Sequence, residues 1–188
     1  MRARCFTTTA VSVIALLLVV VPAQAAVNEP EALTVAIKQA VGKGYNGSLE
    51  VSSPGAASFG RARAIFGAEG GGANPLEETA YTFMFNGSSG FVPSVPVPPK
   101  THLNPAKYLA VIIAPDGGLE YLYAGPTAPP IAQLGTVVTL TLSSSQASTA
   151  SRSCKVDELL ATALRRKHLH ARLASAEHSL QTCKAHHK

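Results

Sequence analysis

Two cysteines, Cys154 and Cys183, stand at the ends of one uninterrupted segment near the C-terminus. The segment between them contains no Gly, Pro or Asn, which is typical of a helix. If that helix were straight, its length of about 1.5 Å per residue would place the cysteines about 44 Å apart. A disulfide requires Cα atoms within roughly 7 Å of each other. This pair therefore constrains the fold more than any other feature, because it demands either a bend or a second molecule.

The first alternative is a hairpin. The apolar residues of the two halves lie on nearly opposite sides of a helical wheel. They are Val156, Leu159, Leu160, Ala163 and Leu164 in the first half, and Leu169, Leu173, Ala176, Leu180 and Cys183 in the second. A chain that folds back at Lys167 and His168, midway between the cysteines, would turn both sides inward and allow an intramolecular disulfide. Against this, the turn region has no Gly, Pro, Asn or Ser to end a helix.

The second alternative is a continuous helix. Each cysteine must then pair with a cysteine of another molecule, as an antiparallel pair of tails would allow. The continuous helix predicts a disulfide-linked homodimer, or a tail-driven oligomeric adhesin that displays the domain preceding the tail. The residues alone leave the hairpin and the continuous helix open.

Residues 1–25 have the pattern of a secretory signal peptide. Arg2 and Arg4 precede a short apolar run, and Ala23 and Ala25 fit the small-residue cleavage pattern. We expect cleavage after Ala25, which also removes Cys5, and no membrane span afterwards. The expected location is extracellular, at the cell surface or in the periplasm, where a disulfide is stable.

Residues 26–143 are expected to form one domain. Residues 29–42 predict a short helix, and six β-rich runs follow between Gly, Pro, Asn and Ser clusters. The runs are 47–53, 58–68, 79–86, 107–114, 119–125 and 135–143, with a tight turn at 115–118 and a Pro-rich strap at 91–105. This spacing predicts a mainly β fold, a small immunoglobulin-like or prealbumin-like β-sandwich. Residues 144–153 predict a linker, and 154–188 a basic helical tail.

Charge is distributed unevenly between these parts. Residues 26–151 carry six Lys or Arg and eight Asp or Glu. Residues 152–188 carry eight Lys or Arg, three Asp or Glu and five of the six histidines. A basic tail can bind an anionic envelope polymer or a protein partner, although a solvated helix face is the commoner use of such charges. No aromatic-rich basic motif points to nucleic acid. No histidine pair has the i, i+4 spacing of a helical metal site, so we expect no metal and no cofactor.

Tyr121 and Tyr123 are the candidate ligand-binding residues, because an i, i+2 pair shares one face of a strand. Two rings on one face can hold a flat ligand such as a sugar, but they serve more often in core packing. No catalytic residues are expected. The enzymatic alternative is a hydrolytic carboxylate and histidine site formed by His102 with Glu69, Asp116 and Glu120, which the sequence does not bring together.

These patterns predict a secreted, non-enzymatic protein with a binding or structural role at a cell envelope or in the extracellular space. The competing hypotheses are the hydrolytic enzyme and the oligomeric adhesin. No motif is specific enough to indicate a family.

Overall fold

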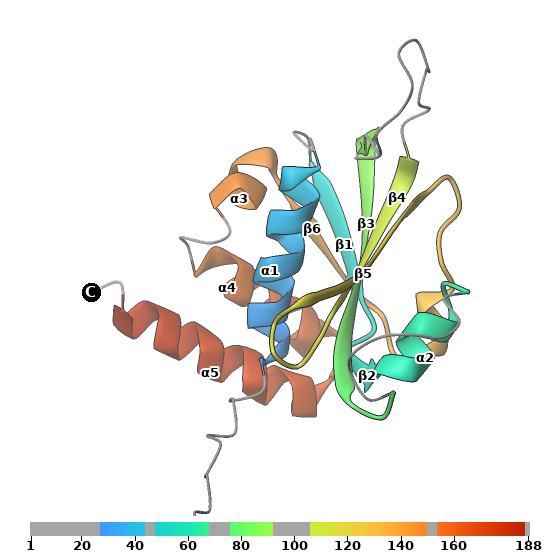
Figure 1. Ribbon diagram of the computed structural model, residues 1–188. Coiled ribbons are helices and arrows are strands. Elements are labelled where there is room, and N and C mark those ends of the chain that lie inside the picture. Colours follow the sequence, from blue (N-terminus) through green and yellow to red (C-terminus); the bar gives the residue numbers. More distant parts are fainter. Residues whose placement is uncertain (1–26, 44–47, 68–75, 92–105, 150–153, 187–188) are drawn as a thin grey trace, which may run out of the picture.

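The computed structural model describes residues 27–43, 48–67, 76–91, 106–149 and 154–186. Figure 1 shows the arrangement of the elements. In chain order they are α1 (Glu29–Gly42), β1 (Leu49–Ser53), β2 (Ala56–Ser58), α2 (Phe59–Ala64), β3 (Thr79–Phe91), β4 (Ala106–Ile113), β5 (Leu119–Gly125), the 3-10 helix η1 (Ile131–Gln133), β6 (Val138–Leu142), α3 (Ser144–Thr149), α4 (Lys155–Arg166) and α5 (His170–His186).

The described strands form one antiparallel sheet of six strands. Their order is β5-β4-β3-β1-β6, and the short β2 pairs with β3 beside this path. Helices lie against this sheet, so the described residues have an α+β architecture. The predicted mainly β sandwich, immunoglobulin-like or prealbumin-like, is not confirmed, because no second sheet is present in the described ranges.

One face of the sheet is covered by α1, α3, α4 and α5 (Figure 1). The predicted helix over residues 29–42 is confirmed, and Asn28 and Glu31 close a capping box at its start. The side of α1 that faces the sheet has no exposed surface at Ala32, Leu33, Ala36, Ile37 and Ala40. This spacing of three and four residues buries one stripe of the helix.

The strands pack the same core from the other side. Val138, Leu140 and Leu142 are buried and alternate with exposed threonines, as the sequence predicts for β6. They share one apolar cluster with residues of α4 and α5. Alternation shows that one face of a strand is buried, but not whether a sheet or a helix covers it, which explains why the sandwich prediction is not confirmed.

The segment 58–68, predicted to be a strand, contains α2 instead. Phe59 and Ala62, three residues apart, are its buried residues. They pack on Ala80 and Ile112 of the second face of the sheet. The segment is too short for a clear helical period, and its aromatic and β-branched residues resemble a strand.

The predicted hairpin of β4 and β5 is confirmed. The amide of Ala114 donates to the carbonyl of Gly118 at 2.9 Å, and the amide of Gly118 donates to the Asp116 carboxylate at 2.8 Å. Gly117 has φ of 82°, a conformation that favours glycine. The turn fixes the register of β5, whose bounds match the predicted run 119–125.

The C-terminal segment folds as a hairpin of α4 and α5. A disulfide joins Cys154 and Cys183, whose Cα atoms are 5.7 Å apart. His168 supplies the turn with φ of 55°. The amides of His168 and Leu169 donate to the carbonyls of Arg165 and Leu164, each at 3.1 Å, in a Schellman motif made without glycine. The continuous helix is therefore wrong, and the intermolecular disulfides that depend on it lose their basis.

The tail is part of the main core and not a separate appendage. Val156, Leu160, Leu164 and Ala176 belong to the same apolar cluster as α1 and the sheet. Residues 144–149, predicted to lie in a linker, form α3, and Ala147 is 5% exposed. No helix in the described ranges is both long and apolar enough to span a membrane. Of the predicted strap at 91–105, Phe91 ends β3 and residues 92–105 lie outside the described residues, as does the predicted signal peptide.

Candidate binding site

The second face of the sheet carries a lighter cover than the first. Figure 1 shows α2 on this side, and Leu134, which follows η1, packs with the buried residues of α2. Cross-strand pairing puts Met84, Ala110 and Tyr123 in one row across β3, β4 and β5, and Asn86, Tyr108 and Gly125 in the next row. Met84 and Tyr123 in the first row and Tyr108 in the second are only partly buried, so both rows reach the surface in part.

A hollow of about 210 Å³ opens beside the end of α2. The residues that line it come from three segments: the chain that ends α2, strand β5, and the loop that follows β5. They are Ile65, Phe66, Tyr123, Thr127, Ala128, Pro129 and Pro130. We call this site the Tyr123 hollow.

Two contacts hold the Tyr123 ring at the wall of the hollow. Its centroid lies 5.9 Å from that of Phe66, with the ring planes tilted by 34°. Its hydroxyl donates to the carbonyl of Thr127 at 3.2 Å. The first contact fixes the ring to the end of α2, and the second fixes the loop after β5 to the ring.

Gly125 makes this position of Tyr123 sterically possible. A Cβ atom at Gly125 would lie 2.2 Å from the Tyr123 hydroxyl oxygen and 2.5 Å from the ring carbon that bears it. Residues two apart on a strand share a face, so Tyr123 lies along β5 over the position that has no side chain. The glycine is therefore needed for this position of the ring.

The composition of the hollow suits binding of an apolar group. Its described lining residues include two aromatic rings, two prolines, Ile65 and Ala128, and the polar side-chain groups among them are the hydroxyls of Tyr123 and Thr127. Typical sites for small molecules measure about 300–1,000 Å³. A hollow of about 210 Å³ therefore matches one ring or one side chain better than a whole cofactor.

The structure places the two predicted ligand-binding tyrosines on β5, opposite Ile112 and Ala110 of β4. Tyr123 lines the hollow, whereas the side chain of Tyr121 lies outside the described part of the chain. Sequence reasoning missed Phe66, because residues 58–68 were assigned to a strand. Phe66 follows the end of α2, and the segment is too short for its spacing from Phe59 and Ala62 to give a clear signal.

The enzymatic alternative remains a prediction. Glu69 and His102 lie outside the described residues. Asp116 and Glu120 lie at the turn before β5 and near the start of that strand. The Asp116 carboxylate accepts the amide of Gly118, a local turn contact.

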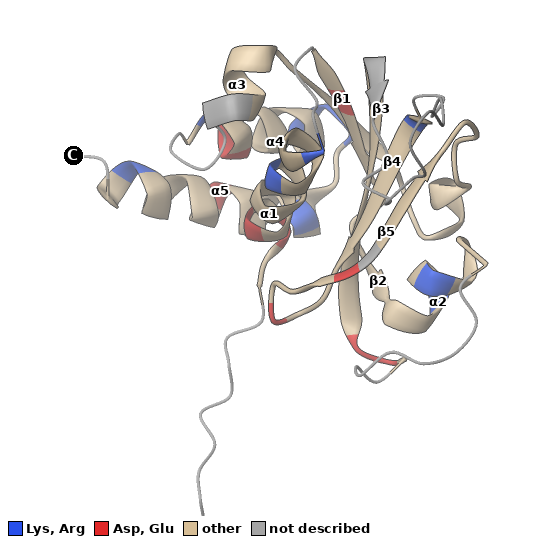
Figure 2. Ribbon diagram, turned by 45° about the horizontal axis from the view of Figure 1, so that its top comes forward, with Lys and Arg blue, Asp and Glu red and all other residues tan. Residues whose placement is uncertain are grey.

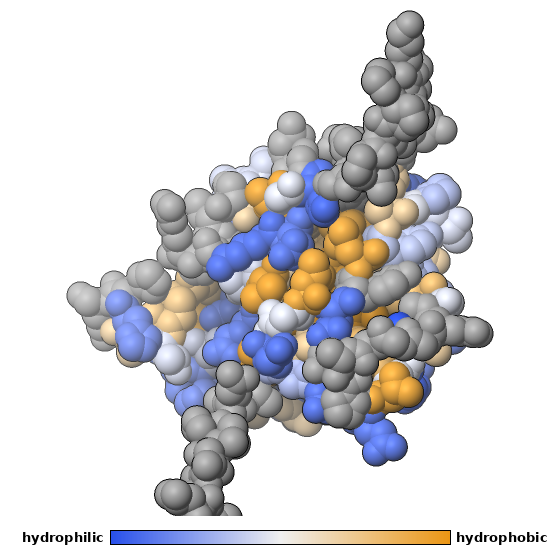
Figure 3. All heavy atoms as spheres, viewed as in Figure 1, coloured by the Kyte–Doolittle hydropathy of each residue, from blue (hydrophilic) through white to orange (hydrophobic). Residues whose placement is uncertain are grey.

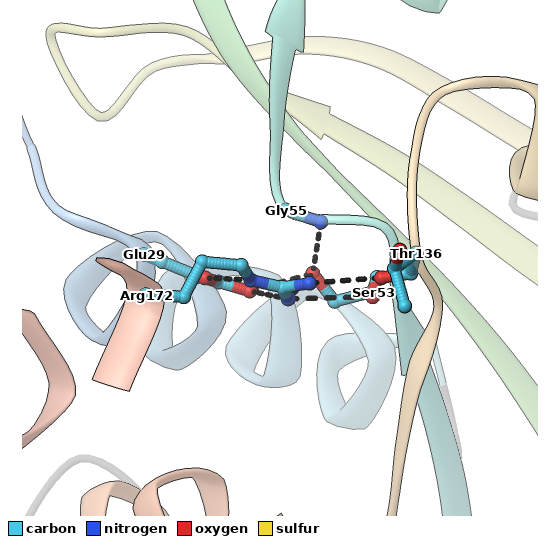
Figure 4. A network of polar contacts seen from close by, with 5 residues as sticks. All are labelled: Glu29, Ser53, Gly55, Thr136 and Arg172. Carbon is cyan, nitrogen blue, oxygen red and sulfur yellow. Dashed lines mark hydrogen bonds and ion pairs between the residues drawn. The ribbon is translucent and has the colours of Figure 1, made fainter. Parts of the chain in front are cut away.

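A polar network at the other side of the sheet ties the helices to the strands (Figure 4). Arg172 of α5 pairs with Glu29 of α1, with its Nε donating at 2.9 Å, and it also donates to the Thr136 carbonyl at 2.9 Å. The Ser53 hydroxyl donates to Glu29 at 2.8 Å. The side chains of Glu29 and Arg172 are 6% and 18% exposed, so this network serves to hold elements together and is not an accessible site.

Basic residues gather at the turn between α4 and α5. The exposed residues here are Arg165, Arg166, Lys167, His168 and His170. The distribution of charge over the other elements is shown in Figure 2. Arg165 pairs with Glu177, and the His168 and His170 rings have centroids 6.4 Å apart. Within the described ranges, no group of three or more His, Cys, Asp or Glu side chains is arranged to hold a metal ion.

Comparisons with known proteins identify no relative: no family model, no curated protein and no solved structure matches this chain.

Proposed function

We propose that the protein is a secreted, non-catalytic binding protein and that the Tyr123 hollow receives an apolar group of its ligand. The observation that carries the proposal is the hollow itself, about 210 Å³ in volume and bordered by the rings of Phe66 and Tyr123. Rigid aromatic rings supply contact area at a small cost in conformational entropy, which favours binding.

Two further features support secretion. Residues 1–25 have the composition of a cleavable signal peptide. The Cys154–Cys183 disulfide closes the C-terminal hairpin, and disulfides persist mainly in oxidising compartments.

The lining residues favour binding over catalysis. Among the described lining residues, only the hydroxyls of Tyr123 and Thr127 could act as an acid, a base or a nucleophile. The Tyr123 hydroxyl already donates to the Thr127 carbonyl. The lining therefore offers shape and apolar contact to a ligand.

The test is a titration of the ¹⁵N-labelled protein with indole, a single apolar ring system, followed by amide chemical shifts. We expect saturable shifts at Phe66, Tyr123 and Ala128. The variant Ala128→Phe should abolish them by filling the hollow, because Ala128 lines it. The matched control is Ala132→Phe, at an exposed position of η1 that does not line the hollow. Shifts that persist unchanged in Ala128→Phe would refute the proposed site.

A second candidate function is attachment to an anionic envelope polymer through the α4–α5 turn. The exposed charges Arg166 and Lys167 support it, because like charges held on a turn attract a polyanion. The measurement is retention on a polyphosphate-coated resin as salt is raised. The double variant Arg166→Glu/Lys167→Glu should elute at clearly lower salt, whereas Lys184→Glu, at the other end of the hairpin, should not. Equal elution of the two variants would refute this attachment site.

A further inference from the structure

Strand β5, which carries Tyr123, is an edge strand of the sheet. Its only neighbour within the described residues is β4. The pairing with β4 is regular from Tyr121 to Gly125, and the only register shift lies at the start of the strand. An edge strand presents alternate backbone N–H and C=O groups that can pair with another chain. Five residues of β5 therefore offer about 17 Å of regular strand edge.

Residues 121–125 of this edge lack the usual protection against strand pairing, because the register shift with β4 lies before them. Proteins commonly block an edge with lysine, proline or a bulge within the exposed part of the strand. The sequence of β5, LEYLYAG, contains neither lysine nor proline, and Glu120 is its single charged residue. The opposite edge strand, β6, differs because α3 and α4 both pack against it.

Both faces beside the β5 edge are apolar. On one face lies the Tyr123 hollow. On the other, Leu122 is only partly buried against the main core. Figure 3 shows apolar surface on this side, between α1 and the strands β4 and β5. A strand added at this edge would place successive side chains against the two faces in turn.

The charges near β5 also indicate the chemistry of a partner. Asp116 is exposed in the turn before the strand, and the described β4–β5 turn has no Lys or Arg. A partner with a basic residue at that end would meet opposite charge, whereas an acidic partner would be repelled.

We propose that β5 binds an extended peptide segment of a partner protein as an added strand, and that one aromatic or large aliphatic side chain of this segment enters the Tyr123 hollow. Backbone hydrogen bonds to residues 121–125 supply affinity, and the hollow supplies selectivity. This inference rests on the proposed function, because it uses the hollow as the ligand site. It adds the class of ligand and the direction from which it binds.

The probe is a pool of seven-residue peptides with a central Trp, β-branched residues on either side and a terminal Lys. The protein contains no Trp, so Trp emission reports on the peptide alone. We expect a saturable blue shift of this emission, with amide shifts of the ¹⁵N-labelled protein concentrated at residues 121–125 of β5. Methylation of alternate backbone nitrogens of the peptide should weaken binding by about tenfold or more, since it removes donors to the strand edge.

The variants separate this inference from the proposed function. Ala128→Phe should remove the blue shift, and Ala132→Phe should keep it. If indole binds the hollow while no peptide in the pool binds, or if the N-methylated peptides bind equally well, strand addition is refuted and the hollow remains a ligand site. If neither indole nor peptide binds, both proposals fail. A dimer whose β5 amides resist hydrogen exchange without peptide would show that a second copy occupies the edge, which also overturns the inference.

Discussion

Arg172 on α5 forms an ion pair with Glu29, the first residue of α1, and so joins two helices through residues that are 143 positions apart in the chain. The same guanidinium donates to the carbonyl of Thr136 in the loop before β6. Gly55 leaves room for it, because a Cβ atom there would lie 2.9 Å from the Arg172 Nε. One side chain therefore fixes α1, α5 and the end of the sheet together.

The first prediction is that Arg172→Met lowers the free energy of unfolding by about 3–5 kcal/mol, because it leaves the buried Glu29 carboxylate without a compensating charge. Urea denaturation followed by circular dichroism measures the change. The matched control is Arg165→Met, which breaks an exposed pair with Glu177 and should cost less than about 1 kcal/mol.

The double variant Glu29→Leu/Arg172→Met should recover most of the loss, since an apolar pair of similar volume needs no charge compensation. Equal costs for Arg172→Met and Arg165→Met would show that the buried pair contributes no more than a surface pair.

The second prediction concerns the disulfide. Replacing both Cys154 and Cys183 by Ser should lower the free energy of unfolding by about 3–4 kcal/mol, from the loop of 29 residues that the disulfide closes. Hydrogen exchange should show the second half of α5 opening first, because Ala176 is the only buried residue of that helix. Uniform loss of protection across α4 and α5 would contradict this order.

The third prediction tests the turn of the hairpin. His168 has φ of 55°, where residues with a Cβ atom are strained. Replacing His168 by Gly should stabilise the protein by about 0.5–1 kcal/mol, and replacing it by Val should destabilise it, because a β-branched residue fits this conformation poorly. Thermal unfolding of the two variants measures both changes. A lower melting temperature for the Gly variant than for the wild type would show that the imidazole itself stabilises the turn.

The fourth prediction concerns pH. Burial raises the pKa of the Asp157 carboxyl above its ordinary value of 3.8, and the charge of Glu31 adds to the rise, while the hydrogen bond from Ser179 opposes it. The folded state therefore holds this proton more tightly than the unfolded state. The contribution of the Asp157 carboxyl to the free energy of unfolding is fully present below pH 3.8. This contribution is lost as the pH rises from 3.8 through the raised pKa of the folded state.

The variant Asp157→Asn should remove this contribution to the pH dependence while keeping an oxygen that can accept from Ser179. Denaturation at a series of pH values should then show a smaller decline above pH 3.8 than in the wild type. An unchanged pH profile would mean that Asp157 titrates alike in the folded and unfolded states.

Some elements of the fold could be predicted from the sequence because their signals are local. The capping residues of α1, the alternation of β6 and the turn at Pro115–Gly118 each depend on neighbouring residues. Which kind of layer covers the sheet could not be predicted from local signals. The apolar faces of α4 and β6 indicate that each is buried, but they do not indicate which element packs against them. The sequence supports a sandwich and a helical layer equally until the tail is placed.

The candidate site was partly predictable for the same reason. Tyr123 follows from its place on a strand, but its contact with Phe66 depends on the assignment of α2. The hairpin depends on His168, which takes a conformation that sequence rules reserve mainly for glycine and asparagine. Residue preferences for helix ends therefore could not decide between a hairpin and a continuous helix.

The last prediction tests the position of Tyr123 without changing an atom of its side chain. Gly125→Ala would place a Cβ atom 2.2 Å from the Tyr123 hydroxyl oxygen, so the ring must move and its contact with Phe66 must change. We expect indole affinity to fall by about tenfold or more, because a displaced ring no longer forms the wall of the hollow. The control is Gly42→Ala, where an added Cβ atom meets nothing within 4 Å. Unchanged indole binding by Gly125→Ala would mean that the ring position does not define the site, and the search for the ligand would then move to the turn between α4 and α5.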